Sequence, residues 1–251
     1  MKQICVIGDS HLAALKLAWN AIEGEYPEIR LTFFGSPAKN LRDVRVENGA
    51  LVPDSEKTLL HLQQTSGGEK EIVPERFDGF LIVALELKID RLIQIYRNYR
   101  AEEHTNPKGV QQYISNACFL QASKGSLQSS LAFEIAEKLR SLTDRPISFL
   151  PQSFPTEDAA KRRTWKEMIE CGDYALLAHT FLRAISELRL AGEHILQQPE
   201  ETRTAEMFTK RDFGVGSVRL IKNDAQHPDD DYAHMNQAYG IVVLKNIIHS
   251  I

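Results

Sequence analysis

The chain alternates between short continuous apolar runs and stretches whose apolar residues recur every three or four positions. The runs lie at 4–7, 29–34, 80–85 and 146–150, and a shorter one lies at 217–221. Runs of this length bounded by turn residues predict buried strands, and the periodic stretches between them predict helices. Strands that alternate with helices in this way predict a parallel sheet covered on both faces.

The helical stretches differ in length. We expect helices over 10–22 and 87–96, a helix that starts at Ser126 as its N-cap, a long helical region over 157–198, and a last helix from Asp231 towards His249. The 157–198 region exceeds an ordinary crossover and has Gly172 at an expected joint, so it predicts an added helical hairpin. Its stripe of Leu177, Phe181, Ile185 and Leu188 is typical of helix packing, and the hairpin either caps the site or makes a homodimer contact.

The remaining segments predict surface structure. Residues 44–52 contain Asn48-Gly49 and predict a hairpin outside the main sheet. Residues 53–78 predict a surface loop with a short element inside it, and the polar stretch 99–125 predicts an exposed loop that borders a cleft. No linker rich in Gly, Ser or Pro interrupts the chain, so we predict one domain over 1–251.

Composition narrows the function. The 251 residues are 43% hydrophobic, which suffices for a full core. The formal net charge is −4, and this balance disfavours nucleic acid and anionic membranes as partners. Neutral or modestly charged small molecules fit better. No run of glycines matches a dinucleotide site, and we expect no cofactor.

Cysteine usage and hydropathy suggest a compartment. Cys5, Cys118 and Cys171 are odd in number and far apart, which argues against a disulfide framework and for a reducing environment. No apolar run approaches the roughly 20 residues that span a bilayer, and the first strand begins at residue 2 with no room for a signal peptide. The sequence therefore predicts a cytoplasmic protein.

The candidate chemistry lies at the two ends of the chain. Gly8-Asp9-Ser10 breaks the first strand with turn chemistry, so Ser10 is expected on a tight turn beside the unpaired N–H groups of a helix start. Asp231 and His234 have a spacing that places them one helical turn apart, where the carboxylate can orient the imidazole. Ser10, His234 and Asp231 thus supply the nucleophile, base and orienting group of a hydrolytic triad.

Simpler roles stand beside these. Ser10 and Asp231 each suit an N-cap, His234 suits a partly buried structural histidine, and the acidic run that includes Asp231 suits a solvated loop. Asp9 most simply acts as a turn former. The pair Asp9-x-His11 also resembles the opening of calcineurin-like metallophosphoesterases, but the other metal-ligand blocks of that family are missing from the sequence. We therefore expect no metal.

Gly8-Asp9-Ser10-His11, combined with Asp231-x-x-His234, resembles the SGNH or GDSL-type hydrolase superfamily. The resemblance implies a flavodoxin-like three-layer α/β fold with about five parallel strands in the order 2-1-3-4-5. It implies that Ser10 is the nucleophile, that His234 and Asp231 complete the triad, and that the N–H groups of Ser10 and Gly35 hold the oxyanion.

The third family block, Gly-x-Asn-Asp, is replaced here by Ala84-Leu85-Glu86-Leu87. Glu86 occupies the place of the asparagine, and an ionised carboxylate donates no hydrogen bond. Either another donor replaces it, with Asn40 the first candidate, or the oxyanion hole has two donors.

These observations predict a serine esterase that acts on O-acyl, expected O-acetyl, esters of a saccharide-like substrate. Two alternatives stay open. One is an acyltransferase that uses a sugar hydroxyl as acceptor, and the other is a non-catalytic binding or scaffold module, which the missing asparagine favours.

Overall fold

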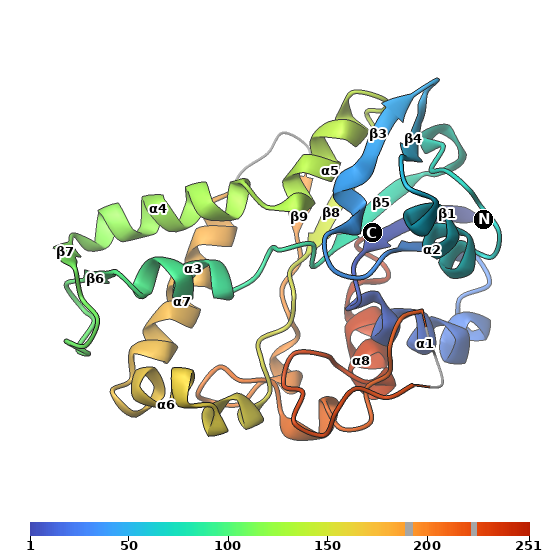
Figure 1. The fold of residues 1–251 in the computed structure, drawn as a ribbon. Helices are drawn as coiled ribbons and strands as arrows, with labels where there is room; N and C mark the ends of the chain where they lie inside the picture. The colour runs from blue at the N-terminus through green and yellow to red at the C-terminus, as the bar shows by residue number, and fades with distance from the viewer. Residues whose placement is uncertain (189–192, 222–224) are drawn as a thin grey trace.

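A five-stranded parallel sheet lies at the centre of the structure, a computed structural model that describes residues 1–188, 193–221 and 225–251 (Figure 1). Its strands are β1 (Lys2–Gly8), β2 (Ile29–Gly35), β5 (Gly79–Val83), β8 (Ile147–Leu150) and β9 (Glu193–Ile195). They pair in the order β2-β1-β5-β8-β9, and every pair is parallel. Counted along the chain, this is the predicted order 2-1-3-4-5, so the predicted α/β fold class is confirmed.

Helices cover both faces of the sheet because side chains alternate along its strands. On one face, residues such as Val6 and Val83 pack against α1 (Leu12–Ile22) and α8 (Gln237–Ile247). On the other face, residues such as Ile7 pack in one cluster with side chains of α2 (Glu56–Ser66) and α5 (Leu131–Arg140). The two layers of helices and the sheet between them make the three-layer arrangement.

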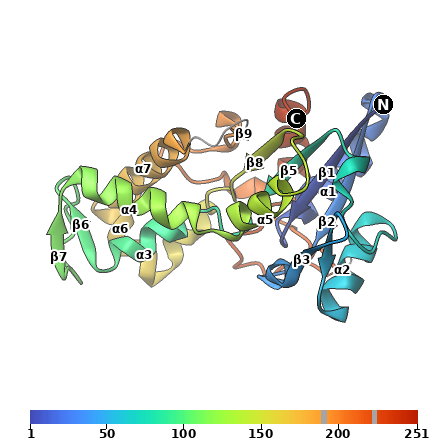
Figure 2. The same ribbon diagram turned by 90° about the horizontal axis from the view of Figure 1, so that it is seen from above.

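Four further helices extend to one side of the sheet in both views (Figures 1 and 2). They are α3 (Asp90–Tyr96), α4 (Asn116–Gln128), α6 (Arg163–Glu170) and α7 (Asp173–Glu187). The short sheet of β6 (Tyr99–Ala101) and β7 (Gln112–Ile114) lies at their far end. Gly172 joins α6 to α7 with φ 82°, as its place in the sequence predicts. The apolar stripe of α7 is buried in the core that these helices share, so it is not available for a homodimer contact. A homodimer contact through another part of the hairpin stays a prediction.

The predicted fifth strand is wrong. The strand that completes the sheet is β9, inside the region predicted to be helical, whereas residues 217–221 contribute only an isolated bridge between Val218 and Gln226. A three-residue strand at a sheet edge has too few apolar positions to stand out in the sequence. Leu220 of the misassigned segment instead packs over the end of β2, where a Cβ on Gly35 would lie 2.7 Å from its Cδ2.

The predicted loop over 99–125 is also wrong, since it contains β6, β7 and most of α4. Ser126 is no N-cap, because it lies in the last turn of α4. The two helices of this region begin after Ser115, whose hydroxyl accepts from the N–H of Cys118, and after Ser130. The surface of α4 is polar, so the hydropathy pattern does not show its helical period.

The hairpin outside the main sheet is confirmed as β3 (Val44–Glu47) and β4 (Ala50–Pro53), which turn at Asn48-Gly49. No helix in the described part of the chain is long and apolar enough to cross a membrane. Short 3-10 helices complete the structure at Glu23–Glu25, Asn40–Asp43, Pro74–Arg76, Glu157–Lys161, Glu200–Thr202 and Arg211–Phe213.

Candidate active site

Ser10 lies in the turn between β1 and α1, as the sequence predicts. The turn is closed by hydrogen bonds from the Leu12 N–H to the Asp9 carbonyl and from the His11 N–H to the Asp9 carboxylate, which is 3.1 Å away. Gly8 permits this close turn, since a Cβ there would lie 2.7 Å from the carbonyl oxygen of Val83. The hydroxyl is therefore carried by backbone that β1 and its neighbour hold in place.

The structure brings Ser10, His234 and Asp231 into one hydrogen-bonded relay. Ser10 Oγ lies 2.9 Å from His234 Nε2, and His234 Nδ1 lies 2.9 Å from Asp231 Oδ2. The Nδ1–H of His234 donates a hydrogen bond to the Asp231 carboxylate, which leaves Nε2 free to accept the serine proton. All three side chains are part-buried, so the relay lies at the edge of the solvent.

The helical reasoning that linked Asp231 to His234 is wrong, although the two side chains do meet. The last helix, α8, begins only at Gln237, after Asn236 as its N-cap. Asp231 instead forms a tight turn in which Oδ1 accepts from the N–H groups of Ala233 and His234, both at 2.8 Å. Burial opposes ionisation of Asp231, but these bonds and the His234 ring outweigh it and hold its pKa below the usual range.

The imidazole of His234 is stacked between two other histidines. The His227 ring lies 3.8 Å from it at 8°, and the His11 ring lies 4.7 Å away at 12°. His227 Nδ1 also lies 3.5 Å from Asp231 Oδ2. Burial, and then the neighbouring charge of His234, lower the pKa values of both flanking histidines. Sequence reasoning missed His227, since nothing in its spacing from His234 indicates that the rings stack.

One ligand atom each from His227, Asp231 and His234 lies within 4.8 Å of the others, so these residues are the group that could hold a metal among the described residues. Asp9 is outside this group, although the rival sequence interpretation made it a ligand. His234 and Asp231 also form the relay, so a metal held there would bind two of its three members. The donor set thus suits an inhibitory ion better than a catalytic one.

The predicted oxyanion donors differ in whether their N–H groups are free to bind a ligand. The N–H of Gly35 donates to Thr65 Oγ1 at 2.9 Å inside the core, so its assignment as an oxyanion donor is wrong in this structure. Within the described residues, the N–H of Ser10 has no acceptor and lies beside its own hydroxyl. Asn40 lines the same cleft as Ser10, and its Nδ2 donates one hydrogen bond, of 3.3 Å, to Ser36 Oγ. An amide has a second N–H, which leaves Asn40 one donor for a ligand.

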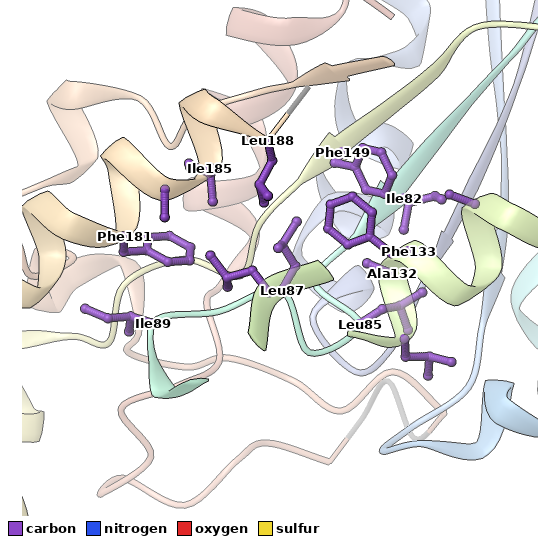
Figure 3. Packing of buried hydrophobic residues seen from close by; sticks show 14 of the residues in the cluster. Ile82, Leu85, Leu87, Ile89, Ala132, Phe133, Phe149, Phe181, Ile185 and Leu188 are labelled. Carbon is purple, nitrogen blue, oxygen red and sulfur yellow. The ribbon is translucent and has the colours of Figure 1, made fainter. Parts of the chain in front are cut away.

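The segment that replaces the third family block has an unusual backbone. Ala84, Leu85 and Glu86 have φ values of 58°, 45° and 66°, a left-handed run that non-glycine residues rarely adopt. Leu85 and Leu87 hold the run in place because both are fully buried in the cluster shown in Figure 3. Burial of these two leucines thus stabilises the strained backbone of the run.

The Glu86 carboxylate lies among three cations. It pairs with Lys39 at 2.5 Å, Arg42 at 2.7 Å and Arg91 at 3.4 Å. Burial opposes its ionisation, but these partners lower its pKa to about 2. Glu86 is therefore ionised at neutral pH and is no oxyanion donor, as its chemistry predicts.

A cleft of about 600 Å³ opens at Ser10 and His234. Its apolar wall is Pro37, Ala38, Leu220 and Ile221, and its polar wall is Asn40, Lys57, His61, Arg219 and His227. His61 is anchored by Ser36, whose Oγ lies 2.7 Å from Nδ1. Lys57, His61 and Arg219 received no role from the sequence, because the cleft joins segments far apart in the chain.

No protein-family model and no curated protein matches the sequence. Among solved structures, the chain is similar to the periplasmic domain of a lipopolysaccharide acetyltransferase from Salmonella ser. Paratyphi A, with 12% identity, TM-score 0.47 and coverage of 100% of this chain and 84% of that one. It is similar to the lipase Lip_vut3 from a goat rumen metagenome, with 11% identity, TM-score 0.46 and coverage of 100% and 97%. A carbohydrate acetylesterase family member from Sinorhizobium meliloti gives 10% identity, TM-score 0.40 and coverage of 100% and 98%.

Fold and site together define a three-layer α/β protein with a serine, histidine and aspartate relay at the carboxyl ends of its strands. The resemblance to the SGNH hydrolases is confirmed at the level of the fold, since the strand order is the one that it implies. At identities of 10–12%, the activity has to be argued from this chain's own site.

Proposed function

We propose that this protein is a serine esterase of the SGNH type that cleaves O-acyl esters, O-acetyl esters above all, of a saccharide. The observation that carries the proposal is the continuous relay from Ser10 through His234 to Asp231, with both links at 2.9 Å. A structural N-cap serine requires no base at its hydroxyl, and here the base has its own orienting carboxylate. The concave cleft around Ser10 gives the substrate a place to bind.

The geometry supports the usual two-step acyl transfer. His234 Nε2 takes the proton from Ser10 as Oγ attacks the ester carbonyl, and Asp231 stabilises the imidazolium. The Ser10 N–H and the free N–H of Asn40 are the donors available to the oxyanion. His234 then protonates the leaving sugar alkoxide. In the second step His234 deprotonates a water, which attacks the acyl-serine and releases the carboxylic acid and the free serine.

Two other activities share parts of this site. If a sugar hydroxyl replaces water in the second step, the same residues make an acyltransferase. A binding module without catalysis is favoured by one observation, namely that Gly35 and Glu86 supply no oxyanion donor. Each donor that is lost from an oxyanion hole lowers the rate by roughly a hundredfold or more, so the esterase is expected to be slow.

The test is labelling with a serine-directed fluorophosphonate together with hydrolysis of 4-nitrophenyl acetate. We expect stoichiometric labelling at Ser10, located by peptide mass spectrometry, and loss of labelling and turnover in Ser10→Ala. Ser186→Ala, at an exposed serine on α7, serves as the matched control and should behave as wild type. An intact protein that is neither labelled nor active, with Ser10→Ala indistinguishable from it, would leave the binding module as the function.

A further inference from the structure

The charges around the cleft are unevenly distributed. Lys57 and Arg219 both line it, and both are exposed. Neither forms an ion pair with a carboxylate in the part of the chain that the structure describes. The cations on the neighbouring loop differ, since Lys39 and Arg42 both pair with the Glu86 carboxylate. Among the residues that the structure describes, the cleft thus has two positive charges with no carboxylate partner, in a protein whose net charge is −4.

The described lining of the cleft brings no carboxylate to these two cations. Among the described residues that line it there is no aspartate or glutamate, and Asp231 lies behind the His234 ring. The cations act on the cleft itself. Burial and then the charge of Lys57 lower the pKa of His61, and the charge of Arg219 contributes, after burial and His234, to lowering the pKa of His227. An anion bound in the cleft would therefore be attracted by both cations.

We propose that the ester cleaved here belongs to an anionic saccharide, one whose ring carries a carboxylate or a phosphate that Lys57 and Arg219 bind while its acyl group faces Ser10. This inference rests on the proposed function for the ester and on the two cations for the charge. Pro37, Ala38, Leu220 and Ile221 offer an apolar wall for the acyl group. A guanidinium suits either anion because it donates in a planar fork, and an ammonium adds a point charge.

Matched esters test the specificity. We would measure kcat/KM for methyl 3-O-acetyl-galactopyranosiduronate, its 6-phosphate counterpart and neutral methyl 3-O-acetyl-galactopyranoside at pH 7.5 and low ionic strength. The acidic substrates should be favoured about tenfold in total, because each exposed pair contributes a few-fold, and 0.5 M salt should remove most of the preference. The preference of one acidic ester over the other identifies the anion. The variant Lys57→Gln/Arg219→Gln should reduce the acidic-to-neutral ratio towards one, and Lys70→Gln, an exposed lysine outside the cleft, should leave the ratio as in wild type.

A binding measurement keeps this inference separate from the esterase proposal. Galacturonate, galactose 6-phosphate and galactose would be titrated into wild type, Ser10→Ala and the double variant, with the bound fraction followed by ligand-observed NMR. Anion-selective binding that the double variant loses supports the inference even if no ester is hydrolysed, in which case only the esterase proposal falls. Equal binding of charged and neutral sugars, or a preference that the double variant retains, overturns the inference even if esterase activity is found.

Discussion

Asp9 offers a quantitative test of how the turn before Ser10 is built. Burial raises the pKa of Asp9 to about 6 from its ordinary value of 3.8, although the His11 N–H and the charge of Lys88 oppose the change. At pH values below about 4 the carboxyl is protonated in the folded and unfolded chains alike. Above about 6 the folded chain must hold a carboxylate that the unfolded chain ionises more readily, so stability falls as pH rises through this window. The gap corresponds to about 3 kcal/mol, an upper value because Asp9 is only partly buried.

Asp9→Asn removes the charge and keeps an oxygen that accepts from the His11 N–H. We expect it to raise the free energy of unfolding at pH 7.5 by about 1–3 kcal/mol and to change it little at pH 4, as measured by urea unfolding at both pH values. Asp144→Asn, at an exposed aspartate, controls for the loss of a negative charge and should show no such pH-dependent gain. An Asp9→Asn variant that is equally or less stable than wild type at pH 7.5 would refute the claim that the ionised carboxylate is held at a cost.

Three further predictions concern other parts of the site and fold. Glu86→Gln should lower the free energy of unfolding by about 1–2 kcal/mol at pH 7, after allowance for its solvent-exposed partners, and the loss should vanish in urea titrations as pH falls from about 4.5 towards 2. Gly240→Ala should lower the melting temperature, with a loss of about 1–3 kcal/mol, because its Cβ would lie 2.2 Å from a carbonyl of α1, whereas Gly24→Ala meets nothing within 4 Å and should be tolerated. His227→Phe keeps a neutral ring against His234, whereas His227→Lys places a cation beside Asp231. The value of kcat/KM on 4-nitrophenyl acetate should therefore be about tenfold lower in the lysine variant than in the phenylalanine variant. Equal values would contradict the view that residue 227 must be uncharged.

The sequence predicted the parts of the fold that rest on dense apolar patterns. The central strands β1, β2, β5 and β8 carry continuous apolar runs, as strands buried on both faces of a parallel sheet do. The edge strand β9 was missed because three residues give no pattern. Helix α4 was missed because its exposed face is polar and only a few of its residues are buried.

The site was predictable where residues are close in sequence and unpredictable where the fold joins distant segments. A local turn, not a helix, brings Asp231 and His234 together. The predicted pair is therefore right, although the helical spacing used to predict it is wrong. Gly35 was predicted by resemblance to be an oxyanion donor, but its N–H donates to Thr65 on α2. The two residues are 30 positions apart, and no local sequence pattern predicts this contact. The stacking of His227 on His234 likewise depends on the path of the loop between them.

The stacking of His11 and His227 on His234 explains how a relay at the edge of the solvent can stabilise the positive charge that forms on His234. When His234 accepts the proton of Ser10, the imidazolium has one counter-charge within hydrogen-bond distance, Asp231. The pKa values of His11 and His227 are lowered by burial and by His234, so both flanking rings are neutral at pH 7 and add no repulsion. The two neutral rings also cover the faces of His234, and a lower local dielectric there strengthens the attraction between the imidazolium and the carboxylate. Acid should therefore lower the activity in two ways. Protonated His227 would repel the His234 imidazolium, and it would compete with His234 for the same Asp231 oxygen.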